Sequence, residues 1–71
     1  MKLNDLKIEQ EGIINRVAAK DSIKRRLMDI GFTKGVKVKP ILMNGSMIAY
    51  KIKGAVIGVR KEDTQDIEVE A

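Results

Sequence analysis

The chain has 71 residues, 44% of them hydrophobic and 34% charged, and 14 Lys and Arg against 10 Asp and Glu give a formal net charge of +4. This length leaves room for one domain, so residues 1–71 are expected to form a single domain. Cysteine and histidine are absent, which excludes disulfides, Cys/His zinc sites and Ser-His or Cys-His catalysis. No apolar run approaches the roughly 20 residues that cross a bilayer, and the start resembles no secretion signal. A cytoplasmic protein without membrane insertion is expected.

The first predicted strand is Gly12–Ala19, a segment with several β-branched residues. Strict alternation fails in it, because Ile14 and Val17 lie three residues apart. Either a bulge lies here, or Ile13 and Val17 face inward while Ile14 covers another edge. Before this strand, three aliphatic residues are expected to form an extended arm that closes one end of the core: Leu3, Leu6 and Ile8.

One helix of roughly ten residues is predicted next, from the spacing of its apolar side chains. Asp21-Ser22 offers an N-cap. Gly31 stands where a left-handed C-cap is needed, and Phe32 is placed to fold back on the last turn. The aliphatic residues that recur at helical spacing are Ile23, Leu27 and Ile30.

A hairpin is predicted at Asn44-Gly45, which lies between the β-rich runs Val36–Met43 and Ser46–Lys53. Asn-Gly favours a type I′ turn, because both central residues of that turn need positive φ. A regular register would place Lys39 opposite Tyr50 on the apolar face, so one extra residue is predicted at or beside Pro40.

The bulged register places Val38 opposite Tyr50 and Val36 opposite Ile52. It also turns Lys37 and Lys51 outward together. The predicted inner face of the hairpin is Val36, Val38, Ile41, Ile48, Tyr50 and Ile52.

The remaining elements are short. Gly54 marks a tight turn into a strand at Ala55–Arg60, and Glu62–Asp66 is typical of a single helical turn. Ile67 and Val69 alternate in a last strand. The whole pattern predicts a mainly β protein, a small SH3-like barrel of about five strands with one α-helix inserted after the first strand.

The order and spacing of these motifs resemble the FeoA family, the small ferrous iron transport protein A. The strongest match is Arg26–Val38 (RLMDIGFTKGVKV), with Arg-Leu, an acidic residue, an aliphatic, Gly, an apolar residue and a second Gly three residues on. Support comes from Leu3 and Leu6, from Ile57–Arg60 and from the final Ile67-x-Val69. The chain also resembles the C-terminal domain of iron-dependent repressors.

This resemblance implies a cytoplasmic accessory protein of bacterial ferrous iron transport. Its implied partner is a FeoB-like membrane transporter, through the cytosolic part that binds GTP. The resemblance implies a role in protein–protein interaction, with no cofactor and no catalytic or metal-binding residue assigned in this chain.

Two surfaces are candidates for partner contact. On the helix, Lys24, Arg25 and Met28 lie outside the core pattern, and a methionine suits a transient interface. On the hairpin, the bulged register places Leu42 and Met47 opposite each other on the outer face, and exposed apolar pairs can mark binding sites. The alternative for the helix is a role in the core and in the following turn only. The alternative for the hairpin pair is that the N-terminal arm or a neighbouring subunit covers it.

Four lysines are predicted to cluster on the outer face: Lys37, Lys39, Lys51 and Lys53. Nucleic-acid binding through this face is the alternative function. It is disfavoured, because Phe32 and Tyr50 are the only aromatic residues and both are assigned to the core, which leaves none to stack on bases. The other interpretation is that these lysines protect exposed strands from aggregation at their edges.

The last residues are acidic, with Glu68 and Glu70 turned outward by alternation. Without imidazole or thiolate ligands, a solvated face is expected here in place of an iron site. The same face could pair with the lysines of another copy and so favour a weak homo-oligomer. No nucleophile–base pair or phosphate-binding glycine loop is found, so no enzyme is expected.

Overall fold

The computed structural model describes residues 1–71 and contains five antiparallel strands in one curled sheet. The strands are β1 (Gly12–Val17), β2 (Lys37–Asn44), β3 (Met47–Ile52), β4 (Ala55–Arg60) and β5 (Ile67–Glu70). Their order in the sheet is β4-β3-β2-β1-β5. The helical elements are a 3₁₀ turn η1 (Leu3–Asp5), α1 (Asp21–Ile30) and α2 (Lys61–Thr64). The predicted SH3-like barrel with one helix after the first strand is confirmed.

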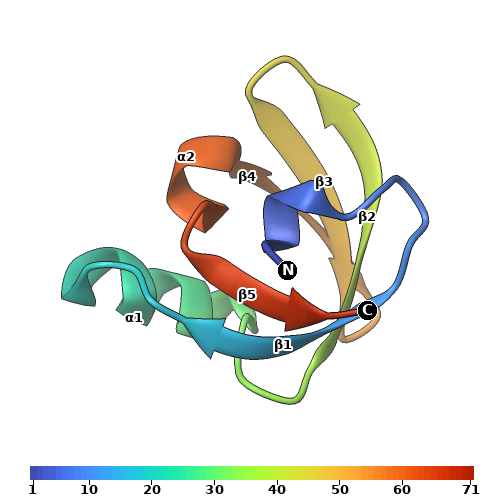
Figure 1. Cartoon of the computed structure of the whole chain (residues 1–71). Coiled ribbons are helices and arrows are strands. Elements are labelled where there is room, and N and C mark those ends of the chain that lie inside the picture. The colour runs from blue at the N-terminus through green and yellow to red at the C-terminus, as the bar shows by residue number, and fades with distance from the viewer.

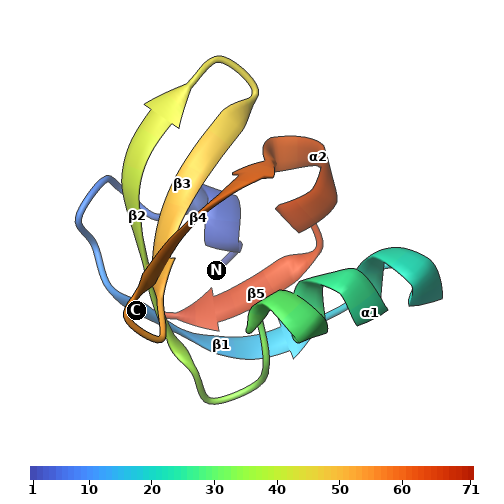
Figure 2. The same cartoon turned by 180° about the vertical axis from the view of Figure 1, so that it is seen from behind.

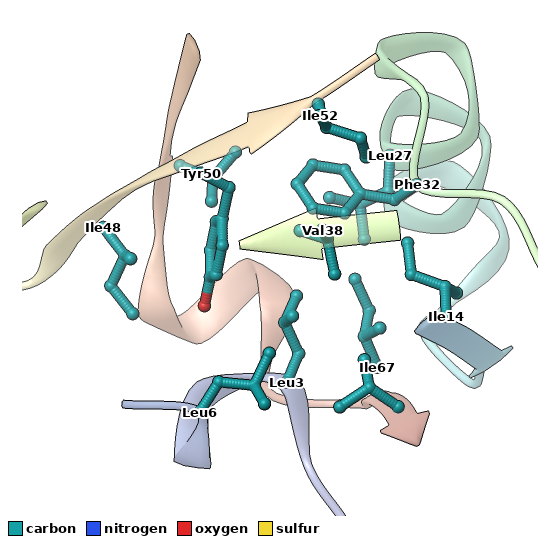
Figure 3. Close-up of a cluster of buried hydrophobic side chains, with 12 residues drawn as sticks. Leu3, Leu6, Ile14, Leu27, Phe32, Val38, Ile48, Tyr50, Ile52 and Ile67 are labelled. Carbon is teal, nitrogen blue, oxygen red and sulfur yellow. The ribbon is translucent and has the colours of Figure 1, made fainter. Parts of the chain in front are cut away.

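The curl of the sheet encloses the core (Figures 1 and 2). The helical turn α2 connects β4 to β5, and η1 packs against both α2 and β5. Buried side chains from η1, α1, β3 and β5 point toward one another in Figure 3, among them Leu3, Leu27, Tyr50 and Ile67. The fully enclosed residues include Phe32 and Tyr50, whose rings meet edge to face with centroids 5.9 Å apart. No helix in the chain combines the length and the apolar character that crossing a bilayer requires.

The apolar face of α1 fixes the helix against the core, and a glycine cap fixes where the helix ends. Leu27 is buried, and Ile23 and Ile30 pack against the core. Gly31 has φ 127°, and the N–H of Phe32 donates to the carbonyl of Leu27 at 2.9 Å. This bond, with the one from Gly31 N–H to the Met28 carbonyl, forms the predicted glycine cap.

The predicted N-cap of α1 is wrong. The helix begins at Asp21 itself, after Lys20, and no side chain caps it. Asp21 therefore lies in the first turn, where its carboxylate complements the positive end of the helix dipole.

Strand β1 contains a bulge, which is the first of the two arrangements predicted for this segment. Its pairing with β5 shifts between Ile14 and Arg16, so Asn15 is the extra residue. Ile14 is buried and Ile13 is exposed, which excludes the alternative arrangement. The N-terminal arm closes the core with Leu3 and Leu6 as predicted, but Ile8 is 45% exposed and takes no part.

The hairpin turn lies one residue later than predicted. Asn44 pairs with Met47, so Gly45 and Ser46 form the turn. Of these two, only Gly45 has positive φ, 60°, which is the pattern of a type II′ turn. The predicted type I′ turn at Asn44-Gly45 is therefore wrong.

The predicted bulge near Pro40 is confirmed, but it falls on Ile41, and this changes the pairing. Pro40 lies opposite Tyr50 and Val38 opposite Ile52, so the predicted pairs with Val38 and Val36 are wrong. Pro40 is buried in place of Ile41, which is half-buried and outside the core cluster. The other predicted inner residues do reach the core: Val36, Val38, Ile48, Tyr50 and Ile52.

A type I′ turn occurs instead at Lys53-Gly54, between β3 and β4. Ile52 pairs with Ala55, and φ is 50° at Lys53 and 80° at Gly54. Lysine is unusual here, because left-handed backbone costs a residue with a Cβ about 1–2 kcal/mol, whereas asparagine tolerates it.

Lys53→Asn is expected to raise the free energy of unfolding by about 1 kcal/mol, which corresponds to a rise in Tm of about 4–8 °C. The gain comes from the backbone preference of asparagine at this turn. Thermal unfolding followed by circular dichroism measures it. Lys53→Gln removes the same charge without the left-handed preference, so an equal gain in both variants would contradict the explanation.

Candidate functional site

A groove of about 460 Å³ runs between β1 and α1. The groove exists because the pairing of β1 with β2 ends at Ile13, opposite Lys37. The last backbone hydrogen bonds run from Ile14 N–H to the Val36 carbonyl and from Gly35 N–H to the Ile14 carbonyl. Beyond that point β1 bulges at Asn15, and the chain returns as α1 beside it (Figure 2). The edge of β1 that faces α1 is thus not covered by a neighbouring strand.

The groove has an apolar part and a charged part. Its apolar lining comes from β1, the segment after it, and α1: Val17, Ala18, Ala19, Met28 and Phe32. Its polar and charged lining is Asn15, Arg16, Asp21, Lys24, Thr33 and Lys34. Because Phe32 also belongs to the buried core, the wall of the groove is fixed to the barrel itself.

Positive charge predominates around this groove. Arg16, Lys24 and Lys34 contribute three cations, and Asp21 is the one carboxylate. Arg16 lies 3.9 Å from Glu68, a largely exposed ion pair of little energetic weight. Neither lysine has a carboxylate within 4 Å, so both ammonium groups are free to meet an acidic partner.

A second hollow of about 390 Å³ continues the groove along α1. Its lining includes Lys24, Arg25 and Met28, together with Asp21 and Asp29. The three contact residues predicted on the helix are therefore brought together on one side of it. Met28 is 44% exposed, so it offers an apolar contact between the charges.

The other two predicted contact residues lie on a different surface. Leu42 pairs with Ala49, and Met47 lies between Asn44 and Arg60. Both face outward, because the alternate residues of β3 fill the core. Their predicted opposition is wrong, because the turn lies one residue later than predicted.

These two side chains nevertheless belong to a larger exposed apolar area. Leu42 is 61% and Val56 62% exposed, and Met47 extends toward Gly58. Val56 was missed in the sequence because its place on the outer face depends on pairing with Lys51. Arg16 and Lys34 were missed in the groove because they come from separate segments, which only the fold brings together.

The acidic residues of the chain do not converge on one point. No three carboxylates lie close enough together to hold a metal ion. The groove, by contrast, combines cationic side chains, the amide of Asn15, the hydroxyl of Thr33 and an apolar wall, which is the chemistry of a binding surface.

Comparison with known proteins identifies relatives over the whole chain. A family model described as FeoA domain matches residues 1–71. The solution structure of the FeoA protein from Chlorobium tepidum superposes with a TM-score of 0.90 at 30% identity, covering 99% of this chain and 69% of that one. No curated protein sequence matches the chain.

Two more distant structures share the fold alone. A zinc complex of FeoA from Stenotrophomonas maltophilia, described as a prokaryotic SH3 domain protein, has a TM-score of 0.82 at 22% identity, covering 99% of this chain and 89% of that one. A manganese-dependent transcriptional repressor has a TM-score of 0.90 at 19% identity. The match covers 100% of this chain and 41% of the repressor, which confirms the predicted likeness to a repressor domain.

Proposed function

The chain belongs to the FeoA domain family, and we propose that it is a cytoplasmic accessory protein of bacterial ferrous iron transport that docks on the cytosolic GTP-binding part of a FeoB-like transporter. The family match supports the role in ferrous iron transport. The groove between β1 and α1 carries the docking proposal, because it combines free cations with an exposed apolar side chain on a rigid wall.

The partner surface that fits this groove is acidic with an apolar residue at its centre. Lys24 and Lys34 in the groove, and Arg25 in the adjoining hollow, would meet carboxylates, and such charges act mainly on the rate of association. Met28 would be covered by the apolar residue of the partner. A flexible thioether adapts to such a contact without a preformed pocket.

The barrel contributes rigidity to this docking. The helix is held by Leu27 and by the glycine cap at Gly31, so its contact side chains keep their positions relative to β1. Partners that are ordered before binding lose less conformational entropy on association. The proposed mechanism is therefore contact with a preformed surface, through which the chain biases the conformation of the transporter.

Met28→Asp is expected to weaken binding to the purified cytosolic domain of the transporter at least tenfold, because it places a carboxylate where the acidic partner must approach. Arg25→Glu is expected to act in the same direction. Isothermal titration calorimetry measures both. Arg26→Glu is the matched control, since Arg26 lies on the same helix, is exposed and lines neither hollow.

Met47→Asp tests the second surface in the same assay. Unchanged binding of this variant beside weakened binding of Met28→Asp supports the groove. If Met47→Asp or Leu42→Asp weakens binding and Met28→Asp does not, the outer face of the hairpin holds the contact and the groove assignment fails.

A further inference from the structure

A separate hollow of about 200 Å³ lies on the outer face of β2 and β3 and is surrounded by lysines. The four ammonium-bearing residues are Lys37, Lys39, Lys51 and Lys53. Glu11 supplies the one carboxylate of the lining, so the side chains around the hollow carry a formal net charge of +3 (four minus one). This feature lies apart from the groove of α1 and shares no residue with it.

Fold stability does not account for these lysines. Lys39 and Lys51 are directly opposite each other in the ladder between β2 and β3, and like charges in such pairs are destabilising. Lys39 has an acidic neighbour in Glu9, at 3.6 Å, but that carboxylate is largely exposed and such a pair contributes little.

Protection of a sheet edge does not account for the cluster as a whole either. On β3, Lys51 has a paired strand on both sides, and on β2, Lys37 is paired with β1, whereas Lys39 lies beyond the two residues of β2 that pair with β1. The edge strand β4 carries no lysine, and only its last residue, Arg60, is charged. At Lys37 and Lys51 the charges therefore lie where edge protection is not needed.

Lys53 adds an independent observation. It occupies the first position of the type I′ turn with φ 50°, where asparagine or glycine is the less strained choice. Strained backbone at a residue with a chemically useful side chain is typical of functional sites. In this conformation Lys53 lines the hollow beside Lys51.

We propose that this lysine hollow binds phosphate groups that together carry several negative charges, either the phosphate chain of a small polyphosphate or the headgroups of neighbouring anionic lipids. Lysine binds phosphate as a compact point charge, and several lysines around one concavity suit an anion with several charges. Bound phosphate also offsets the repulsion between Lys39 and Lys51. Nucleic acid fits less well, because Phe32 and Tyr50 are both buried and leave no aromatic surface for base stacking.

Binding of inorganic tripolyphosphate to the full chain tests the proposal by calorimetry and by amide chemical shifts at 50 mM salt. A saturable one-to-one complex is expected, with shifts concentrated at the four lysines and affinity that falls toward 200 mM salt, because added salt screens the attraction between exposed charges. A second arm uses vesicles of phosphatidylglycerol against vesicles of phosphatidylcholine. Binding in the first arm identifies a soluble polyphosphate, and binding in the second arm alone identifies the lipid headgroup.

The double variant Lys39→Gln/Lys51→Gln is expected to weaken this binding at least tenfold without lowering Tm, since it removes a like-charge pair. Lys7→Gln/Lys20→Gln is the matched control, with the same loss of charge at two exposed lysines outside the hollow. Equal weakening in both double variants would show nonspecific attraction and overturn the proposal. Absence of binding in both arms, or tighter binding of a single-stranded oligonucleotide than of tripolyphosphate, would also overturn it.

Discussion

Asn4→Ala is expected to lower the free energy of unfolding by about 3 kcal/mol, because it removes the acceptor of the buried Tyr50 hydroxyl and leaves the Thr64 hydroxyl only longer bonds to the carbonyls of Arg60 and Lys61. The Oδ1 atom of Asn4 accepts hydrogen bonds from Thr64 Oγ1 at 2.7 Å and from the Tyr50 hydroxyl at 3.1 Å. Its Nδ2 donates to the Lys61 carbonyl at 2.9 Å. One side chain thus links η1 to β3 and α2, and Thr64 and Tyr50 are both fully buried.

Chemical denaturation measures the loss, and Tm is expected to fall by roughly 12–24 °C for a domain of this size. A double-mutant cycle separates the network from a local effect at residue 4. Tyr50→Phe is expected to cost less in the Asn4→Ala background than in the natural chain, because the hydroxyl it removes has already lost its partner. Additive losses would show that the two side chains act independently.

Above pH 10 the free energy of unfolding is expected to fall by about 1.4 kcal/mol per pH unit through the titration of Tyr50. Burial raises the pKa of Tyr50 from 10.0 to about 12, and the neighbouring Thr64 hydroxyl lowers it in part. Below pH 10 the phenol is protonated in both states and contributes nothing to the pH dependence. Between pH 10 and 12 the unfolded chain loses this proton while the folded chain keeps it, so rising pH favours unfolding.

The composition makes this pH dependence directly observable. Tyr50 is the only tyrosine, and tryptophan is absent, so the phenolate absorbance near 295 nm reports a single group. The folded chain is expected to titrate near pH 12, and the chain in denaturant near pH 10. Tyr50→Phe is expected to lose this component of the alkaline destabilisation. A folded-state midpoint near pH 10 would contradict the burial effect.

The local elements could be predicted from the sequence because their signals lie within a few residues. The spacing of Ile23, Leu27 and Ile30 predicted α1, and Gly31 predicted its end. The contact residues Lys24, Arg25 and Met28 were predicted together for the same reason, since neighbours on a helix share a side. The structure places them along one hollow.

The hairpin shows where local signals become insufficient. Two registers fit the sequence, because a turn displaced by one residue shifts each cross-strand partner by two residues and so keeps Val38, Tyr50 and Ile52 on the inner face. The choice between them follows from packing: Pro40 is enclosed opposite Tyr50, and Ile41 is left as the extra residue. That choice also determined how Leu42 and Met47 lie on the outer face.

The amino-acid sequence by itself determined the family, the mainly β barrel, the helix and most of the core, since alternation, helical spacing and glycine positions act over short distances. The tertiary structure decided the rest: the register of the hairpin, the hydrogen bonds of Asn4 to residues 46 and 60 positions away, and the groove that collects Arg16 and Lys34 with Lys24. It also showed that Lys39 and Lys51 lie opposite each other beside the lysine hollow. These features depend on which distant segments meet, and that is settled by the packing of the whole core.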